Sequence, residues 1–406
     1  MDYLQQLLNN QPVEWKKLGE VCTKVCSDGT PSTSNPEYYK GNIPWLRTQD
    51  VDWKDVYDTD IKITEEAIKN SSAQWIPANC VIVAMYGATA AKACINRIPL
   101  TTNQACCNLQ VDENIAHYKY VYHWICREYE RLRALGEGSQ SNLSGKKIKD
   151  YKIPIPPLSV QSRIVEILDK FTAMEAELQA ELELRKKQYA YYREQLLNFS
   201  YTPPSEFNVV YRKLGEMAEL VRGNGLSKKD FAPEGIPAIH YGQIYTYYGN
   251  ETKETISFVT PETASKLRKV FCGNVVITNT SENLEDVGKA LLYSGESEAV
   301  TGGHATIIRC SEHLLPKYFV YYTMTYSFFD QKRKLAKGTK VIDVSATDLA
   351  RIEIPLPPLS EQQRIVEILD KFDTLTNSIS EGLPLEIKLR RQQYEYYREQ
   401  LLDFRN

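Results

Sequence analysis

The sequence predicts an α+β protein built twice: two globular α+β domains separated by two long helices, which pair antiparallel as a coiled coil and give an internal pseudo-two-fold repeat. Three observations lead to this fold class. The chain repeats itself, each repeat contains a helix with apolar residues spaced about 3.5 apart, and short β-branched runs alternate with Gly-, Asn- and Thr-rich loops between the helices. The 406 residues suffice for two to three domains of about 150 residues each.

The internal repeat is read directly from the letters. IPIPPLSVQSRIVEILDKF, from Ile153, returns as IPLPPLSEQQRIVEILDKF from Ile354, 201 residues later. QYAYYREQLLNF, from Gln188, returns as QYEYYREQLLDF from Gln393, 205 residues later. The segments between are far less alike, so two similar helices alternate with two divergent domains. The predicted boundaries are 1–152 for the first domain, 153–200 for the first helix, 201–351 for the second domain and 352–406 for the second helix.

Each repeated segment predicts one long helix. Prolines keep the entry extended, and Ser159 is a favourable N-cap. The apolar seam has the coiled-coil period, and the two helices pair most simply antiparallel because a domain lies between them. The four-residue difference in offset is a stutter near Gly382 and Pro384, where we expect a kink. The predicted seam is Ile164, Leu168, Phe171, Leu178, Leu182, Tyr189, Tyr192 and Leu196 with Ile365, Leu369, Phe372, Ile379, Leu383, Tyr394, Tyr397 and Leu401.

Two alternatives concern these helices. Each helix could instead pack only on its own domain, although a seam this long favours pairing. The tyrosine clusters at 189–192 and 394–397 resemble surfaces for stacking on bases, but their place at the seam favours packing between helices or subunits.

Composition and charge exclude several classes of protein. The net charge of -3 excludes a uniformly basic coat protein for nucleic acid, although the globular segments are slightly basic and the helices acidic. The basic cluster at 332–340 is of a kind that usually forms a solvated face. The N-terminus lacks a signal peptide, no apolar stretch could span a bilayer, and the nine cysteines are scattered. We therefore expect a reduced, cytoplasmic protein without a membrane partner.

Catalytic and metal-binding motifs are missing. Neither the spacing of Cys22 and Cys26 nor that of the histidines suggests a metal site, and no Walker A, G-x-S-x-G or H-E-x-x-H string occurs. The best nuclease candidate is Glu251 with Lys253 and Asp230, but short E-x-K strings arise by chance. The sequence therefore favours a binding protein over an enzyme.

The duplicated plan, with its P-P-L-S-x-Q-x-R-I-V-E-I-L-D-K-F helix start, resembles the specificity subunit of type I restriction–modification enzymes. The first half adds motifs similar to one class of target-recognition domain in that family. The second half keeps only the framework, which suggests a different DNA half-site. These motifs are GTPSTSNPEYYKGNIPWLR, ITEEAIKNSSAQWIP, MYGATAAKACI, TTNQACC and GSQSNLSGKKIKDYKIPIP.

The resemblance implies a non-catalytic subunit that binds double-stranded DNA and no cofactor of its own. Each target-recognition domain would read one half of a bipartite, asymmetric target. The paired helices would set the spacer and dock two methyltransferase (modification) subunits, which use S-adenosylmethionine. Two restriction subunits, which use ATP and Mg, would complete the nuclease, although a modification-only system remains open. A four-residue change of about 6 Å in helix length would correspond to roughly two base pairs.

Direct readout of bases needs hydrogen-bonding side chains on loops, and these define the candidate DNA-binding residues. For Asn103 and Gln104 a buried amide network is an equally good interpretation, and for Thr30 to Thr33 a helix cap or turn. The candidates in the first domain are Thr30, Ser32, Thr33, Arg47, Thr48, Gln49, Tyr86, Lys92, Asn103, Gln104, Gln140 and Asn142.

The second domain offers its own set, in which glycines at 223, 225, 302 and 303 permit close approach of the backbone. His304 follows two glycines, and a turn or a phosphate contact is a better interpretation than catalysis. The candidates are Arg222, Asn224, Lys228, Lys229, His240, Tyr241, Gln243, Asn279, Thr280, Ser281, Lys289, His304 and Lys340.

Two other functions compete with DNA reading. A coiled-coil scaffold that binds only proteins predicts no sequence-dependent effect on DNA, and it leaves the divergence of the two domains unexplained. A nuclease using Glu251 and Lys253 predicts metal-dependent cleavage by the purified chain.

Overall fold

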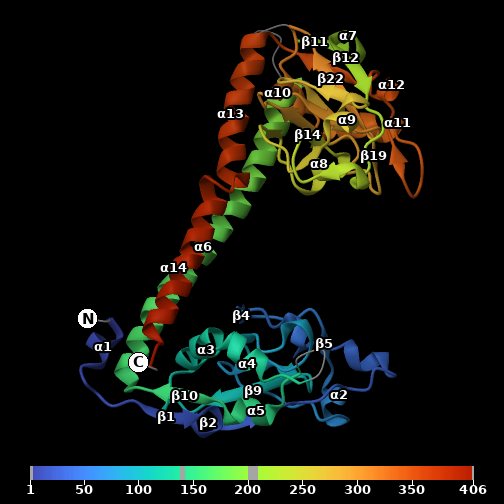
Figure 1. Ribbon diagram of the computed structural model, residues 1–406. Helices are drawn as coiled ribbons and strands as arrows, with labels where there is room; N and C mark the ends of the chain where they lie inside the picture. Colours follow the sequence, from blue (N-terminus) through green and yellow to red (C-terminus); the bar gives the residue numbers. More distant parts are fainter. Residues whose placement is uncertain (1–2, 138–141, 200–208, 405–406) are drawn as a thin grey trace. The chain divides into compact units, whose positions relative to one another are not determined.

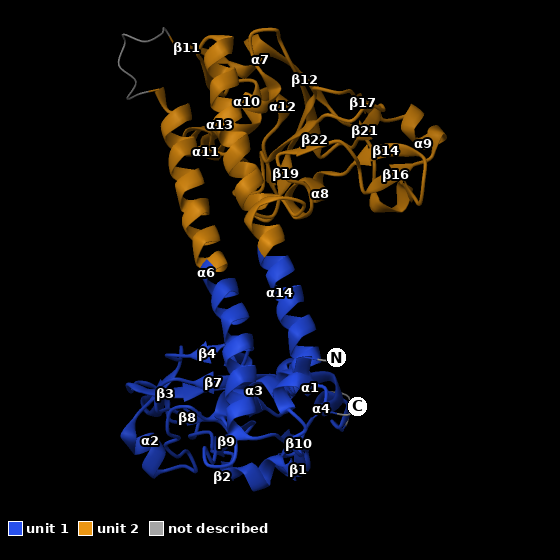
Figure 2. Ribbon diagram, turned by 90° about the vertical axis from the view of Figure 1, so that its left-hand side faces the viewer, with its two compact units in different colours: residues 1–177, 387–406 blue, residues 178–386 orange. Residues whose placement is uncertain are grey.

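The computed structural model describes residues 3–137, 142–199 and 209–404, so that Gln140 lies outside the described residues. They form two compact units (Figure 2). Unit 1 comprises residues 1–177 and 387–406, and unit 2 comprises residues 178–386. Each unit therefore contains one globular domain together with a segment from each of the two long helical stretches.

Unit 1 begins with a short helix and continues into a mixed domain (Figure 1). Its helices are α1 (Tyr3–Leu8), α2 (Glu65–Lys69), α3 (Tyr118–Arg127), α4 (Tyr129–Ala134), α5 (Gly145–Asp150) and the start of α6 (Leu158–Leu197). Its strands are β1 (Glu14–Lys17), β2 (Cys22–Cys26), β3 (Ile43–Leu46), β4 (Asp55–Val56), β5 (Lys62–Ile63), β6 (Val81–Ala84), β7 (Ala93–Asn96), β8 (Thr101–Thr102), β9 (Cys106–Val111) and β10 (Lys152–Ile155).

Unit 2 repeats this plan with additions. Its helices are α7 (Leu214–Met217), α8 (Tyr241–Thr246), α9 (Pro261–Ser265), α10 (Pro316–Tyr322), α11 (Tyr326–Leu335), α12 (Ala346–Leu349), α13 (Leu359–Asn377) and the start of α14 (Gly382–Leu401). Its strands are β11 (Val210–Lys213), β12 (Ala218–Arg222), β13 (Phe231–Ala232), β14 (Ile236–Ile239), β15 (Glu251–Thr252), β16 (Ser257–Val259), β17 (Arg268–Val270), β18 (Val275–Thr278), β19 (Thr280–Ser281), β20 (Ala290–Tyr293), β21 (Ala299–Thr301), β22 (Ala305–Cys310), β23 (Ile342–Asp343) and β24 (Glu353–Leu356).

The two domains share one framework of sheets. The larger sheet of unit 1 has the order β2-β9-β6-β7-β4, and its counterpart in unit 2 has the order β12-β22-β18-β20-β15. The parallel pair β3·β8 corresponds to β14·β21, and the ribbon β1·β10 corresponds to β11·β24. Unit 2 adds strands β13 and β17 to its second sheet and the ribbon β19·β23. The α+β class with an internal repeat is therefore confirmed, and β-branched runs of the kind expected form β6 and β18.

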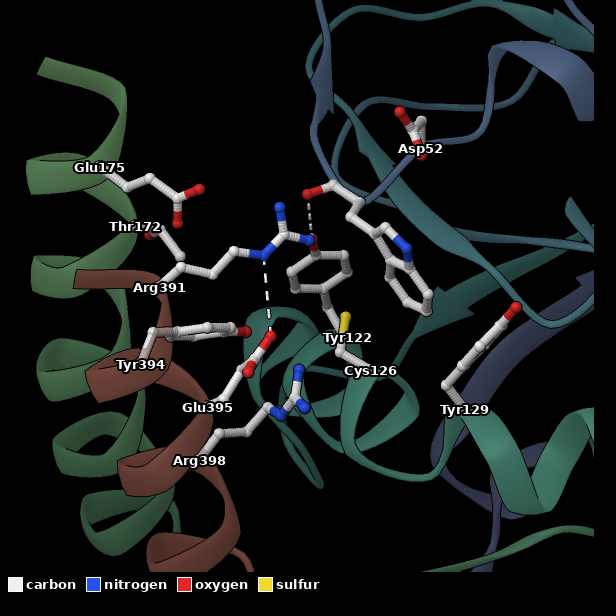
Figure 3. A pocket seen from close by; sticks show the side chains of 11 residues that line it. Asp52, Tyr122, Cys126, Tyr129, Thr172, Glu175, Arg391, Tyr394, Glu395 and Arg398 are labelled. Atoms are coloured by element: carbon white, nitrogen blue, oxygen red, sulfur yellow. Dashed lines mark hydrogen bonds and ion pairs between the residues drawn. The ribbon is translucent and has the colours of Figure 1, made fainter. Parts of the chain in front are cut away.

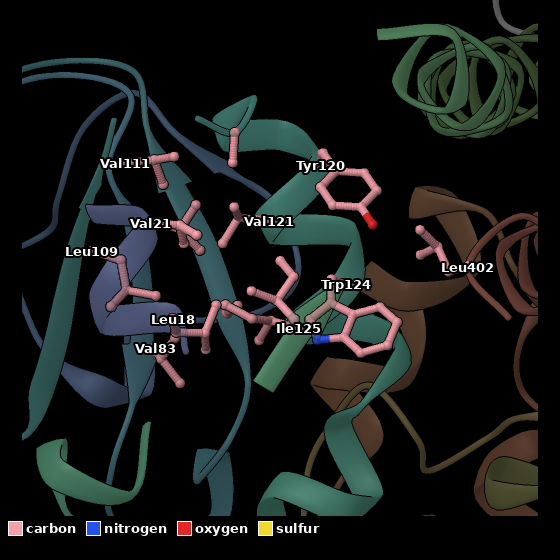
Figure 4. Packing of buried hydrophobic residues seen from close by; sticks show 14 of the residues in the cluster. Leu18, Val21, Val83, Leu109, Val111, Tyr120, Val121, Trp124, Ile125 and Leu402 are labelled. Carbon is pink, nitrogen blue, oxygen red and sulfur yellow. The ribbon is translucent and has the colours of Figure 1, made fainter. Parts of the chain in front are cut away.

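The core of unit 1 lies between its larger sheet and α3 (Figure 4). Val83 and Leu109 on the sheet face Val121, Trp124 and other apolar side chains of α3, and all four are fully buried. The same core includes residues from both helical segments, among them Ile164 of α6 and Leu401 of α14. Removing this apolar surface from water stabilises the folded state by about 25 cal/mol per Å². Because residues of both helical segments contribute to this surface, the helices are part of the hydrophobic core of the domain.

In both units the helical segments pair antiparallel, as predicted. In unit 1, Phe171 of α6 stacks on Tyr397 of α14 with 5.1 Å between ring centroids. In unit 2, Tyr192 of α6 stacks on Phe372 of α13 at 5.4 Å. Leu182, Tyr189, Ile365, Leu369 and Leu383 of the predicted seam are buried.

Two details of the helix prediction are wrong. Ile379 is 85% exposed, because it lies in the break at residues 378–381 between α13 and α14, where the helical periodicity does not hold. The break itself was expected, and Gly382 at its end has a φ of +74°, which favours glycine. Ser159 is not the N-cap of α6, because the helix begins at Leu158 directly after the prolines.

A buried glutamine fastens each helix start to its domain in the same way. The side chain of Gln161 accepts a hydrogen bond from His117 N at 2.9 Å and donates to Pro156 O at 2.8 Å. Gln362 accepts from Leu315 N at 2.9 Å and donates to Pro357 O at 3.0 Å. Both side chains are fully buried, so each helix enters its domain at a fixed position.

Candidate nucleic-acid interface

Five loops of unit 1 are joined side by side into one surface, which we call rim 1. It consists of residues 27–33, 47–49, 85–92, 103–105 and 142–143. Asn103 N donates to Leu46 O at 3.0 Å, Met85 N to Ala105 O at 2.8 Å, and Leu143 N to Met85 O at 2.8 Å. The Thr30 hydroxyl bonds to Gln104 Oε1, and the Thr89 hydroxyl to Thr48 O at 2.8 Å. These bonds connect the loops that the sequence separates by up to 116 positions.

Rim 1 contains all the candidate DNA-binding side chains of unit 1 that the structure describes. Ser32, Thr33, Gln49, Tyr86, Gln104 and Asn142 are exposed. Arg47 is half-buried, with Nε at 3.5 Å from Asp50 Oδ2 and, in the amide orientation that satisfies both groups, Nη2 at 2.7 Å from the Gln49 oxygen. A guanidinium held in this way loses little side-chain entropy on binding, which suits the reading of a guanine edge. Lys92 is engaged with Asp52 at 2.6 Å.

Unit 2 builds the equivalent surface, rim 2, from residues 222–229, 240–243, 279–289, 302–304 and 337–344. Gly303 N donates to Gly225 O at 3.1 Å, Asn279 N to His304 O at 2.8 Å, and Val344 N to Asn279 O at 2.8 Å. Gly223 is required by close packing, because a Cβ there would lie 2.1 Å from Gly302 O. Hydrogen bonding between backbones therefore brings together the glycine-rich loops that the sequence analysis selected.

Several predicted side chains of rim 2 already bond within the protein, among them three amides. Asn279 is fully buried and bonds through its amide to Val344 O at 2.7 Å and to the Thr306 hydroxyl at 2.8 Å. Gln243 donates to Ser257 Oγ at 2.6 Å and accepts from His240 N at 3.3 Å. Asn224 donates to Lys266 O at 2.6 Å. Burial of Asn279 favours a structural role for it.

The candidates of rim 2 also differ in exposure. Arg222, Asn224, Lys228, Lys229, His304 and Lys340 are exposed, whereas His240, Thr280 and Ser281 are buried. Burial is the main cause that lowers the pKa of His240. Lys289 is half-buried, with Nζ at 3.5 Å from Tyr245 O. Pairing of β19 with β23 brings the turn that carries Lys340 to the rim.

Two supporting residues were missed by sequence reasoning. Asp28 is a buried residue of rim 1 that accepts from Thr102 N at 3.3 Å and from the Thr102 hydroxyl at 3.1 Å, and burial raises the pKa of its carboxyl. Lys332 is buried rather than part of a solvated face. It donates to Val287 O at 2.5 Å and to Glu285 O at 3.1 Å, and burial lowers its pKa to about 8. No local pattern marks either residue, because their partners are distant in sequence.

The residues considered for nuclease or metal chemistry are engaged elsewhere. Glu251 pairs with Lys317 at 2.5 Å, and Asp230 accepts from Ser227 N at 2.6 Å. Among the described residues, no group of three His, Cys, Asp or Glu side chains is arranged to hold a metal ion. All nine cysteines are free thiols. In the same part of the chain, no helix is long and apolar enough to cross a membrane.

A cavity of ≈ 400 Å³ lies at the junction of α3 with the helical segments of unit 1 (Figure 3). Tyr122 and Cys126 of α3 face Arg391, Tyr394 and Arg398 of α14 across it. Polar side chains that line the cavity interact with other groups of unit 1. Tyr122 donates to Trp53 O at 2.7 Å, and Arg391 lies 3.7 Å from Glu395. The cavity belongs to the attachment of the domain, and the predicted DNA-binding residues do not line it.

The framework sets equivalent positions in the two rims, and the side chains at these positions differ. The residue that follows β3 is Arg47, and the one that follows β14 is His240. In both cases a side chain three residues later accepts from its backbone N–H. The residue before β9 is Ala105, whereas the one before β22 is His304. Two equal scaffolds therefore present different chemical groups.

Comparisons with known proteins agree with this architecture. The family described as type I restriction modification DNA specificity domain matches residues 10–184 and 206–389. The chain is 38% identical over 304 residues to the EcoR124I/EcoR124II specificity subunit of Escherichia coli, covering 72% of each chain. It is 30% identical over 421 residues to a putative type I specificity subunit of Haemophilus influenzae, covering 99% of this chain and 98% of that one.

Solved structures show the same fold. A structure reported for complex assembly and conformational transition of the type I restriction–modification system matches with a TM-score of 0.61 at 17% identity, covering 97% of this chain and 98% of that one. The S subunit from M. genitalium matches with a TM-score of 0.55 at 15% identity, covering 98% of both. With the family matched in both halves and a relative that is 30% identical over nearly the whole of both chains, the chain belongs to the family of type I restriction–modification specificity subunits and carries two target-recognition domains.

Proposed function

We propose that this chain reads a bipartite, asymmetric DNA target, one half with each rim, and is not itself catalytic. The observation that carries the proposal is the pair of rims, which share a backbone framework and differ in the side chains they present. Phosphate contacts position a protein on DNA, whereas hydrogen bonds to base edges specify sequence. Two rims with different donors and acceptors therefore suit two different half-sites.

Methylation-sensitive sequencing of a methylation-free host tests this reading. One strain carries the chain with its cognate methyltransferase subunit, and the other carries the methyltransferase alone. We expect a split motif with methylated adenine only in the first strain. If the two strains show the same methylation although the complex is shown to form, the chain does not read DNA. The protein-binding scaffold is then the favoured function.

Variants in one rim sharpen the test. Arg47→Ala in rim 1 removes a guanidinium held by Asp50 and Gln49, and each good bidentate contact to a base is worth about 1–3 kcal/mol. We expect relaxed recognition at one position of a single half-site, with the other half unchanged. Arg131→Ala, an exposed arginine of α4 outside rim 1, is the matched control.

The paired helices are proposed to set the spacer and to dock two methyltransferase subunits that use S-adenosylmethionine; two ATP- and Mg-dependent restriction subunits would add cleavage. Support comes from apolar side chains that recur on the outer faces. Leu184 and Tyr191 of α6 are 64% and 60% exposed, and their repeat equivalents Leu389 and Tyr396 of α14 are 48% and 61% exposed. A leucine and a tyrosine one heptad apart, found twice, suit two copies of one helical partner.

Substitution of these tyrosines tests the docking face. We expect Tyr191→Ser to lower the affinity for one of the two methyltransferase copies, and Tyr191→Ser with Tyr396→Ser to lower it for both, by about tenfold or more per site. Stoichiometry by native mass spectrometry is the measurement. Tyr57→Ser, an exposed tyrosine of the first domain, serves as the control. Unchanged stoichiometry and affinity in the double variant would remove this face from the interface.

A further inference from the structure

A buried lysine is bonded to one loop of rim 2. Lys332 of α11 is 4% exposed, and its ammonium donates to Val287 O at 2.5 Å and to Glu285 O at 3.1 Å. Both carbonyls belong to residues 282–288, between β19 and β20, which we call the acidic loop. The lysine follows its two partners by 45 and 47 positions in the sequence, so the contact is made by the fold.

The apolar stem of Lys332 is enclosed as well. Gly288 closes over it with a φ of +76°, and a Cβ added to this glycine would lie 3.1 Å from Lys332 Cδ. The ammonium lies 5.1 Å from the centroid of the Phe329 ring. Burying a charged group costs free energy that an aliphatic side chain of the same length would not incur. The two hydrogen bonds to the acidic loop are what the lysine adds at this position.

The charges of the acidic loop match the ammonium beneath its backbone. Glu282 and Glu285 are exposed, and Asp286 is half-buried. Burial lowers the pKa of Lys332 to about 8, whereas Glu285 and Asp286 raise it. The group is therefore mainly an ammonium at neutral pH, and its bonds to the carbonyls are charge-assisted. Carboxylates held in this way can accept from the amino group of a base and are repelled by phosphate, so their position affects which bases fit.

Rim 1 builds the corresponding segment differently. Eight residues, 85–92, connect β6 to β7, whereas eleven, 279–289, connect β18 to β20. The shorter segment is bonded by Leu143 N to Met85 O. Helix α4 follows α3 as α11 follows α10, and the buried residue of α4 is Leu132. The lysine thus accompanies the longer segment of the second domain.

We propose that Lys332 is a positioning residue for DNA reading by rim 2, which holds the acidic loop in one conformation and thereby sharpens the choice of base pairs in the second half-site. The inference rests on the proposed function and deepens it, because Lys332 itself touches no DNA. Without the ammonium, Val287 O and Glu285 O lose their donor and the loop is no longer fastened to α11. A loop that takes several conformations accepts more base pairs, because less is lost when a partner on the base is wrong.

The test uses the full chain assembled with its methyltransferase subunits. Adenine methylation is measured on the duplex with the methylated motif and on duplexes with one base pair changed in either half-site, which gives a ratio of kcat/KM for each change. Lys332→Met keeps the length of the side chain and has no donor. We expect its ratios to fall about tenfold at one or more positions of the second half-site and to stay unchanged in the first. On the original duplex KM should rise while kcat stays within about twofold.

Two further variants separate positioning from loss of stability. Leu314→Ala removes a buried side chain from the core of the same unit, outside rim 2, and should lower the melting temperature without changing any ratio. Lys332→Gln keeps a donor on a shorter side chain and should relax the same positions as Lys332→Met. It decides the question if Lys332→Met does not fold.

The outcomes distinguish this inference from the proposed function. If the wild-type complex methylates duplexes with a changed second half-site as well as the original, reading by rim 2 fails. If the wild type discriminates and the folded Lys332 variants keep every ratio, the role of Lys332 is overturned while DNA reading stands. The same holds if Leu314→Ala relaxes the same positions, because the effect would then follow from stability alone.

Discussion

A single buried histidine distinguishes how the two domains attach to the helices. His123 of α3 is 1% exposed; its Nε2 lies 3.2 Å from Asp169 of α6 and its Nδ1 lies 3.0 Å from the hydroxyl of Tyr394 on α14. Lys119 also pairs with Asp169. In unit 2 the corresponding helix α10 uses Tyr321 with Asp370 and Lys317. The sequence shows these residues, but only the packing of α3 makes His123 part of a buried network.

We expect this histidine to make the stability of unit 1 depend on pH. Burial, the dominant cause, lowers the pKa of His123 below 6.5, against the opposing effect of Asp169; Lys119 and Arg398 lower it further. The unfolded chain therefore takes up a proton near pH 6.5 that the folded imidazole does not, so stability is full above this pH and falls below it. We expect the free energy of unfolding to drop between pH 7 and pH 5.

His123→Tyr introduces the residue type that unit 2 has at the corresponding position, Tyr321, and so isolates the contribution of His123 to the pH dependence of stability. Denaturant unfolding of this variant and of the wild type at pH 5 and pH 7 is the measurement. The variant should lose less free energy of unfolding between pH 7 and pH 5 than the wild type. Because His117 is present in both proteins, the effect of its own lowered pKa cancels in this comparison. Equal losses in the two proteins would show that His123 does not carry the dependence.

At the scale of elements, the short helix α1 is a third copy of a helix end. YLQQLLN from Tyr3 corresponds to YREQLLN from Tyr192 and to YREQLLD from Tyr397. In unit 1 its Leu4 and Leu8 are buried in the core that also contains Leu401 and Leu402. The leucine pattern is visible in the sequence, but the burial of Leu4 and Leu8 depends on α14, which lies near the other end of the chain.

Leu4→Ala should therefore destabilise unit 1. Truncating a fully buried leucine costs about 2–5 kcal/mol, because transfer free energy is lost and a cavity remains. Gln5→Ala on the exposed face of α1 should leave stability within about 0.5 kcal/mol. Urea unfolding of both variants is the measurement. A loss below 1 kcal/mol in Leu4→Ala would mean that α1 frays from the core.

The break between α13 and α14 depends on one glycine. With a φ of +74°, Gly382 has a conformation that side chains rarely adopt, and an added Cβ would lie 2.5 Å from Thr374 O. Gly382→Ala should cost about 1–3 kcal/mol through backbone strain and this clash. Gly249→Ala has no atom within 4 Å of the added Cβ and is the matched control. Thermal unfolding distinguishes the two, and equal melting temperatures would contradict the strain.

At the scale of the whole molecule, the shared framework predicts that recognition domains are interchangeable. The ribbons β1·β10 and β11·β24 and the buried glutamines Gln161 and Gln362 attach each domain to its helix in the same way. Replacing residues 211–351 by residues 15–151 should therefore give a folded chain. If each domain reads one half-site, the methylated motif of this chimera has two identical halves, which sequencing of the methylation-free host reports. A chimera that folds and forms its complex but keeps the original second half would contradict this assignment.

The repeat, the class of fold, the long helices, the break near Gly382 and the loops that carry polar side chains could all be predicted from the amino-acid sequence. These are local properties, because periodicity, prolines and glycines act within a few residues of one another. Which side chains are available was decided by tertiary structure. Asn279 and Lys332 look like surface residues in the sequence and are buried, whereas His304, on a loop that bonds through its backbone to Gly225 and Asn279, is exposed. Exposure depends on what lies across the fold, and no local pattern encodes that.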